Sequence, residues 1–265
     1  MTANIVNRMP LIIANLPDDC SERTLLQNVS PVVRDAHELA VELLFCVPQY
    51  LIRDTSQLIA QTTIGGLLPG IAVNITDHWT SGPITGVPGE MMREYNARAI
   101  LGSPQARLRP SFDSTSLQKL TLQAQDYGVA PIICVGPGEN SFLTDDDQII
   151  SSQLKMVLDG VTIPENTTFV LLGSSRWKVL RAIYLARFIR EKIEEVQPGV
   201  ASKIRIIYHR GRESISNYNL FPFIVGTSID GVFVDANAFV GEPQELTQMV
   251  RTTFESHPGT MFPRT

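Results

Sequence analysis

The segment Lys203–Phe239 determines how the rest of the chain is interpreted. It begins Lys-Ile-Arg-Ile-Ile-Tyr-His-Arg-Gly-Arg and ends Ile-Asp-Gly-Val-Phe-Val-Asp-Ala-Asn-Ala-Phe. Two short apolar runs within it, Ile204–Tyr208 and Val232–Val234, each give way abruptly to polar residues. Buried parallel strands have this pattern, and in an α/β barrel the residues that follow the strands form one mouth. The polar residues expected at that mouth are His209, Arg210, Asp235 and Asn237.

Six further apolar runs precede this segment, and each is short enough to be a buried strand. They are Leu11–Asn15, Val41–Cys46, Ile71–Asn74, Ala97–Leu101, Pro131–Val135 and Thr168–Leu172. Stretches with helical spacing separate them, and Arg176–Val196 is the clearest amphipathic helix. Thr144 is predicted to cap another helix, and Gly128 to end a third. Eight strands alternating with helices predict an α/β fold, either a (β/α)₈ barrel or an open doubly wound sheet.

The bulk composition limits the classes of function. The chain has 265 residues, which suits one large domain spanning 1–265, and 43% of its residues are hydrophobic. Its formal net charge of −5 argues against a nucleic-acid or anionic-membrane partner. Three widely spaced cysteines predict reduced thiols in the cytoplasm. We recognise no cofactor motif and no cluster with metal-ligand spacing, so neither a cofactor nor a metal is expected.

Five short stretches in different parts of the chain carry a family resemblance. They are Leu11–Asn15, Gly82–Gly86, Ala99–Gly102, Ile133–Gly136 and Arg205–Tyr208. In this order and spacing they resemble the triosephosphate isomerase family, over essentially the whole chain. The resemblance implies a TIM barrel, which decides between the two folds above. It also implies a homodimer formed through the loop Thr80–Glu90, because the similar loop of the family enters the partner subunit.

The departures from the family pattern fall on its active site. The substrate-binding Lys, the electrophilic His and the basic Glu of the family are matched here by Pro17, Ser103 and Ser174. The final Gly-Gly turn, which receives the phosphate, falls on Asp235-Ala236. A carboxylate at that turn repels a phosphate dianion. We therefore expect a small-molecule substrate without phosphate.

The segment that would form the family's lid is also expected to be missing from this chain. Only thirty residues, 178–207, separate Trp177 from Tyr208, which is fewer than the family uses for its Gly-rich lid and sixth helix. A site that cannot close over a reactive phosphorylated intermediate loses it to water. Isomerisation of triose phosphates is therefore not expected of this chain.

His209 and Asp235 are the predicted catalytic pair, because they follow adjacent strands at one mouth. A carboxylate beside an imidazole fixes its tautomer and supports acid–base chemistry near neutral pH. The alternative is a pair that only replaces the hydrogen bonds lost with the phosphate. Asn15, at the end of the first strand, is predicted to orient a substrate oxygen. The further residues predicted to contact the substrate are Arg210, Arg176, Ser174, Ser103 and Asn237.

Two functions from different classes remain open on the sequence. The first is an isomerase, or a related lyase, with a rebuilt site that moves protons on a non-phosphorylated small molecule. The second is a catalytically inactive barrel that acts as a binding or assembly protein. The polar residues His209, Arg210 and Asp235 favour the first, because simple decay of a site leaves small or apolar replacements. The loss of every catalytic residue of the family except Asn15 favours the second.

Overall fold

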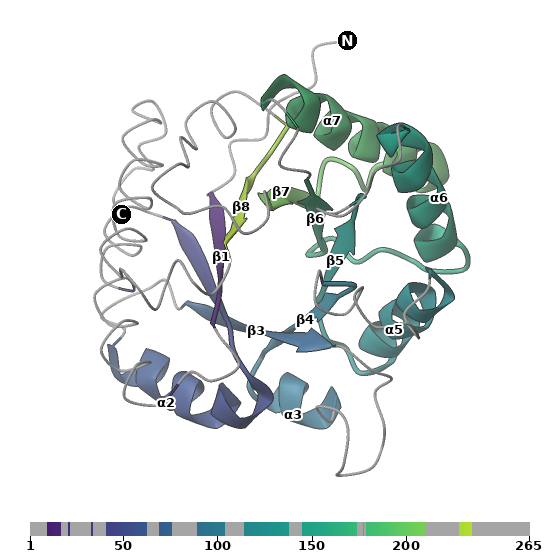
Figure 1. The fold of residues 1–265 in the computed structure, drawn as a ribbon. Helices are drawn as coiled ribbons and strands as arrows, with labels where there is room; N and C mark the ends of the chain where they lie inside the picture. The colour runs from purple at the N-terminus through teal and green to yellow at the C-terminus, as the bar shows by residue number, and fades with distance from the viewer. Residues whose placement is uncertain are drawn as a thin grey trace.

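The protein folds as a closed parallel barrel surrounded by helices (Figure 1). The computed structural model describes residues 10–16, 21, 33, 41–62, 69–75, 89–103, 114–137, 145–173, 177, 179–209 and 228–234. Its strands are β1 (Leu11–Asn15), β2 (Glu42–Cys46), β3 (Gly70–Ile75), β4 (Arg98–Leu101), β5 (Pro131–Val135), β6 (Thr168–Leu172), β7 (Arg205–His209) and β8 (Gly231–Val234). Each strand pairs in parallel with the next, and β8 pairs with β1. The predicted barrel is confirmed, and the open sheet is excluded.

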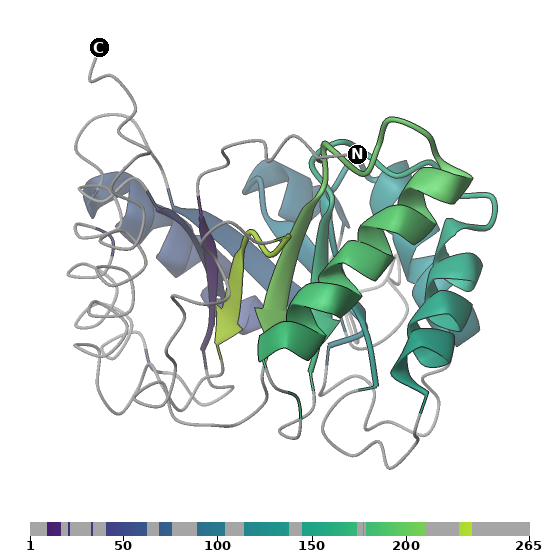
Figure 2. The same ribbon diagram turned by 90° about the horizontal axis from the view of Figure 1, so that it is seen from above.

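Helices cover the outside of the barrel in both views (Figures 1 and 2). The described helical segments are the 3₁₀ turn η1 (Gln49–Leu51), α2 (Ile52–Thr62), α3 (Gly89–Glu94), α5 (Ser114–Asp126), α6 (Asp146–Leu158) and α7 (Val179–Val196). Gly128 has φ +66°, as expected of a glycine just beyond a helix end. The predicted cap of α6 was wrong by one residue. Asp145 takes that role, and its side chain accepts a hydrogen bond of 3.0 Å from the backbone N–H of Gln148.

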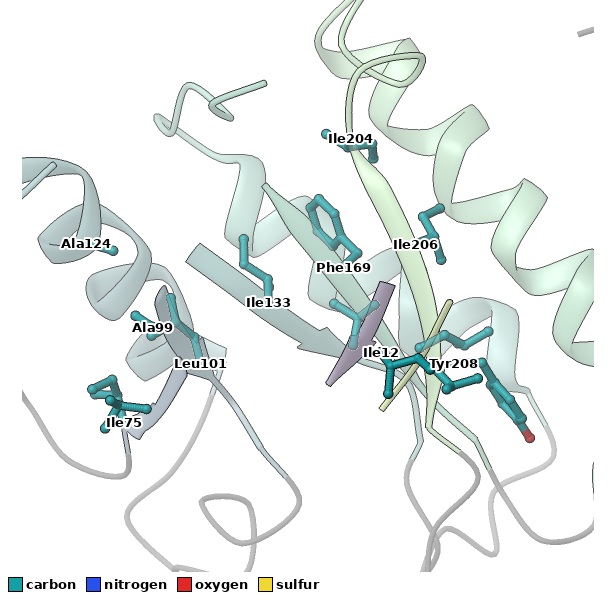
Figure 3. Packing of buried hydrophobic residues seen from close by; sticks show 14 of the residues in the cluster. Ile12, Ile75, Ala99, Leu101, Ala124, Ile133, Phe169, Ile204, Ile206 and Tyr208 are labelled. Carbon is teal, nitrogen blue, oxygen red and sulfur yellow. The ribbon is translucent and has the colours of Figure 1, made fainter. Parts of the chain in front are cut away.

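The strands place alternate side chains in two separate apolar clusters. The larger cluster lies between the strands and the helices, and Figure 3 shows Ile206 and Tyr208 of β7 within it. The smaller cluster fills the barrel. Its members are Leu11, Ile13, Leu44, Cys46, Ala72, Ile100, Ile132, Cys134, Val170, Leu172, Ile207 and Phe233. Burying each large side chain contributes roughly 1.5–3 kcal/mol, and a slip of one residue in register would exchange the two clusters.

Charged side chains close the end of the barrel where the strands begin. Glu42, Arg98 and Arg205 are the first residues of β2, β4 and β7. Glu42 Oε1 lies 2.8 Å from Arg98 Nη2, and Glu42 Oε2 pairs with Arg205 Nη1. All three side chains are less than a quarter exposed. One carboxylate therefore links three strands that are not neighbours in the sheet.

Strand β7 starts and ends one residue later than the apolar run Ile204–Tyr208 predicts. The N–H of Ile204 bonds to Val200 in the preceding turn, and the N–H of Arg205 is the first to bond to the neighbouring β6 side, at Thr167. At the other end, His209 pairs in register with Leu172, and its carbonyl accepts a 2.7 Å hydrogen bond from the N–H of Gly173. His209 is therefore the last residue of the strand and not, as predicted, the first residue beyond it.

Candidate active site

The carboxyl ends of the strands present two kinds of inward side chain. The last inward residues of the odd strands β1, β3, β5 and β7 are Asn15, Asn74, Cys134 and His209. Those of the even strands β2, β4, β6 and β8 are Cys46, Ile100, Leu172 and Phe233. In (β/α)₈ barrels, alternate strands supply the side chains of one layer. The odd-strand layer is thus mostly polar and lies at the mouth, while the even-strand layer is apolar.

His209 lies inside this end of the barrel. Its ring packs edge-on against Phe233 of β8, with ring centroids 5.0 Å apart and planes at 61°. The residue is only 2% exposed. The imidazole therefore faces the barrel interior and not the helix layer, which is the side that an acid–base role requires. Its burial also means that packing, as well as hydrogen bonding, sets its orientation.

Asn15 is held by a second amide that the sequence analysis did not single out. Asn74 Nδ2 donates a 3.3 Å hydrogen bond to Asn15 Oδ1, across the gap from β3 to β1. Asn15 is 4% exposed. Because Asn15 Oδ1 accepts this hydrogen bond, the NH₂ group of Asn15 points away from Asn74. The missed signal was a repeated pattern, because the first and third apolar runs both end in Asn at the carboxyl end of a strand.

Asn74 also brings an unsatisfied acceptor to the site. Its Oδ1 is buried and accepts no hydrogen bond within the described part of the chain. A buried carbonyl oxygen without a partner costs about 1–3 kcal/mol. Asn74 therefore places an acceptor beside Asn15 at this end of the barrel, and such an oxygen is suited to a hydroxyl donor.

Ser103, which is predicted to contact the substrate, lies two residues beyond β4. It is fully buried, and the preceding Gly102 has φ +70°. That left-handed turn costs a residue with a Cβ about 1–2 kcal/mol and suits glycine. Ser103 thus places a short, fully buried polar side chain just beyond the carboxyl end of β4.

The ends of β5 and β6 are fixed by a contact from α6. Gln153 Oε1 accepts a 2.7 Å hydrogen bond from the N–H of Gly136, and Gln153 Nε2 donates at 3.4 Å to the Gly136 carbonyl. Gly136 has φ +122°, and a Cβ on it would lie 2.5 Å from the carbonyl oxygen of Leu172. Since Leu172 pairs with His209, glycine here allows the backbone beside His209 to pack closely.

The other predicted site residues lie outside the described residues. They are Asp235, Arg210, Arg176, Ser174 and Asn237, together with Pro17 and residues 80–88 of the loop Thr80–Glu90. Of the predicted set, the structure brings Asn15, Ser103 and His209 to the same end of the barrel. Within the described ranges, no group of three His, Cys, Asp or Glu side chains could hold a metal ion. No described helix is both long and apolar enough to cross a membrane.

The chain is similar to known proteins over most of its length. The family profile described as triosephosphate isomerase matches residues 16–253. A protein of that name from Shewanella pealeana is 23% identical over 248 residues, which covers 88% of this chain and 95% of the relative. Those of Shewanella frigidimarina and Shewanella halifaxensis are 25% and 24% identical, over 76% and 88% of this chain and 83% and 95% of the relatives. The matched range runs from the residue after β1 to a point past β8.

Proposed function

Because the chain belongs to the triosephosphate isomerase family, we propose that it is an isomerase-type enzyme whose site has been rebuilt for a small molecule without phosphate. A single observation carries this proposal. The His209 imidazole points into the barrel at the carboxyl end of β7, which is the same end of the barrel as Asn15 and Asn74. Active sites of such barrels are built at this end. The absence of the family's Lys, His and Glu from positions 17, 103 and 174 supports a changed reaction centre.

The proposed chemistry is proton transfer between carbon or oxygen atoms of the substrate. His209 takes a proton from a carbon next to a carbonyl group, and the electron pair of the broken C–H bond moves toward the carbonyl oxygen. The Asn15 amide N–H donates to that oxygen and stabilises its growing negative charge. The imidazolium then returns the proton to the former carbonyl carbon, and the hydroxyl proton of the adjacent carbon moves to the former carbonyl oxygen, which completes the isomerisation of a hydroxy-carbonyl compound. In a related lyase, His209 would take the proton from a hydroxyl group β to the carbonyl group. That hydroxyl carbon becomes a new carbonyl as the carbon–carbon bond breaks, and the electron pair of this bond moves toward the existing carbonyl oxygen.

Asp235 is proposed as the partner of His209, since it directly follows Val234 at the end of β8. Adjacent strands lie about 4.8 Å apart, so side chains from neighbouring strand ends can meet. A carboxylate beside the ring would hold its tautomer and stabilise the imidazolium. Arg210, Arg176, Ser174, Ser103 and Asn237 are proposed to contact the substrate. Arginine in particular presents a planar fork of donors suited to a carboxylate or carbonyl group.

Hydrogen–deuterium exchange tests this proposal even when the reaction product is not identified. The protein is incubated in D₂O with glyceraldehyde, dihydroxyacetone and erythrulose, and ¹H NMR follows the C–H signals next to the carbonyl group. We expect signal loss faster than in protein-free solution, and about 10²-fold or more slower exchange in His209→Gln. The amide variant keeps a hydrogen-bonding side chain of similar size, and its melting temperature serves as the control for folding.

A catalytically inactive barrel is the second candidate, and one observation favours it. Asn15, Ser103 and His209 are all at most 4% exposed, so bulk solvent does not reach them in this form. Such a protein would act by binding or assembly. Equal exchange rates for the natural protein, His209→Gln and the protein-free control would support this candidate against the first.

We also propose a homodimer formed through the loop Thr80–Glu90, in the cytoplasm. The described end of that loop is fixed to its own barrel, because Gly89 at the start of α3 packs against the ring of Tyr127 so closely that a Cβ would collide with it. A loop with one anchored end is suited to reach toward a partner subunit. Sedimentation at micromolar concentration is expected to give a dimer, and a monomer would count against this assembly.

A further inference from the structure

A cavity with polar and apolar lining lies at the end of the barrel where the strands begin. It has a volume of about 290 Å³ and is bounded by β2, β3, β4, α2 and the residues that follow α3. One wall is polar and includes Glu42, Arg98, Ser56 and Tyr95. The floor is apolar and includes Leu44 and Ile59, both at most 5% exposed. A mostly apolar pocket with a few convergent polar groups is the usual form of a small-molecule site.

An ion-pair cluster with a net positive charge borders the cavity. Glu42 pairs with two guanidinium groups, Arg98 at 2.8 Å on the cavity wall and Arg205, which does not line the cavity. Among the described residues, this cluster carries two positive charges against one negative charge. Within the described residues, Arg98 makes its ion pair through Nη2 alone, and a guanidinium carries five N–H donors. The remaining donors of Arg98, on the cavity wall, are suited to a second carboxylate.

Hydroxyl groups add neutral donors to the same wall. Arg53 Nε lies 3.3 Å from Tyr95 Oη and donates to it, so the hydroxyl hydrogen of Tyr95 is directed to another acceptor. Ser56, one turn along α2 from Ile52, also lines the cavity. A ligand with a charged head and a short apolar tail satisfies the two surfaces together.

We propose that this cavity binds a small organic anion, a monocarboxylate with a short unbranched apolar chain. The carboxylate pairs with Arg98 on the side away from Glu42 and accepts from Tyr95 and Ser56. The chain lies on Leu44 and Ile59. Arg98 begins β4, whereas His209 ends β7, so the cavity and His209 lie at opposite ends of the barrel. The proposal does not depend on the function proposed for the end with His209.

Butanoate and its neutral isostere butanamide test the proposal by titration into the ¹⁵N-labelled full-length protein. We expect saturable butanoate shifts in the backbone amide signals of Ser56, Gly70 and Asn96, with an affinity in the millimolar range typical of so small a ligand. Butanamide is expected to bind at least tenfold more weakly, because it has the same shape without the charge. Equal binding of the two compounds, or no saturation by about 100 mM butanoate, would overturn the proposal.

Three variants locate the binding in the cavity. Arg98→Gln removes the charge and is expected to weaken butanoate binding at least tenfold, while Glu42 keeps its pair with Arg205. Ser56→Leu fills the cavity without touching an ion pair and is expected to have a similar effect. Gln57→Leu, an exposed neighbour on the same helix that does not line the cavity, is the control and should bind normally. Butanoate shifts centred on Asn15 and His209, or undiminished binding by Ser56→Leu, would place the anion elsewhere and contradict the proposal.

Discussion

The two ends of the barrel are built from opposite chemistry. Where the strands begin, the inward side chains of β2, β4 and β7 are charged and paired, with Glu42 between Arg98 and Arg205. Where the strands end, three of the odd strands, β1, β3 and β7, present amides and an imidazole, represented by Asn15 and His209. Ion pairs hold non-adjacent strands together at an end where no reaction has to occur. Groups that can exchange a proton or share a hydrogen bond are placed at the other end, which is where barrels of this type act.

The largest expected effect concerns the end with His209. We expect the purified protein to interconvert glyceraldehyde 3-phosphate and dihydroxyacetone phosphate no faster than the buffer does. The reason is the predicted match of Pro17, Ser103 and Ser174 to the Lys, His and Glu of the family. A coupled spectrophotometric assay measures the rate. Turnover near ~10 per second, the median for enzymes, would show that the end with His209 kept the family's chemistry.

The next effect concerns the charged end. Glu42→Gln leaves Arg98 and Arg205 without a carboxylate and is expected to lower the free energy of unfolding by about 2–3 kcal/mol, somewhat less than for a fully buried pair. The matched control is Glu165→Gln, because Glu165 pairs with Lys203 while both side chains are at least half exposed. That change should cost less than about 0.5 kcal/mol. Urea unfolding measures both, and equal losses would remove the structural role assigned to Glu42.

A smaller effect is expected from the backbone beside His209. Gly136→Ala introduces a Cβ at φ +122° within 2.5 Å of the Leu172 carbonyl and should cost about 2 kcal/mol. Gly128→Ala is the control, since Gly128 has φ +66° but no atom within 4 Å of the added Cβ. It should cost about 1 kcal/mol. Thermal unfolding distinguishes the two. A loss at Gly136 no greater than at Gly128 would mean that the end of β5 yields easily and does not fix the site.

The smallest effect separates the two roles of Asn74. Asn74→Ala removes the donor to Asn15 and should cost about 1 kcal/mol of unfolding free energy. Asn74→Asp sets a carboxylate against the Asn15 oxygen and should cost about 1 kcal/mol more, because like partial charges then face each other. In both variants we expect the side-chain NH₂ signals of Asn15 to move in NMR spectra. Unmoved Asn15 signals in Asn74→Asp would show that the amide pair does not orient Asn15.

The barrel could be predicted from the sequence because its signal repeats eight times. Runs such as Pro131–Val135 and Thr168–Leu172 are continuous and apolar, and their bounds were predicted correctly, since both faces of such a strand are buried. The eighth strand was also found, although only three of its residues were assigned. Family resemblance, and not periodicity, decided between a closed barrel and an open sheet.

The candidate site was harder to predict, because its residues act through contacts between strands far apart in the chain. Nothing local to Asn74 shows that it will bond to Asn15, which lies 59 positions earlier. The position of His209 was missed by one residue because a buried imidazole at a strand end looks polar in sequence. Its packing on Phe233 also makes His209→Ala a poor test, since the lost ring would leave a cavity in the barrel. His209→Gln avoids that loss.

The Glu42–Arg205 pair has a consequence for how the chain is made. Its two residues are 163 positions apart, so a growing polypeptide carries Glu42 long before its second arginine exists. The pairing of β1 with β8 requires a still later residue, because it joins Leu11 to Gly231. Closure of the ring therefore waits until β8 has been synthesised. Until then β1 offers an unpaired edge to its surroundings, and a nascent chain stalled after β6 would be prone to associate with another chain through that edge.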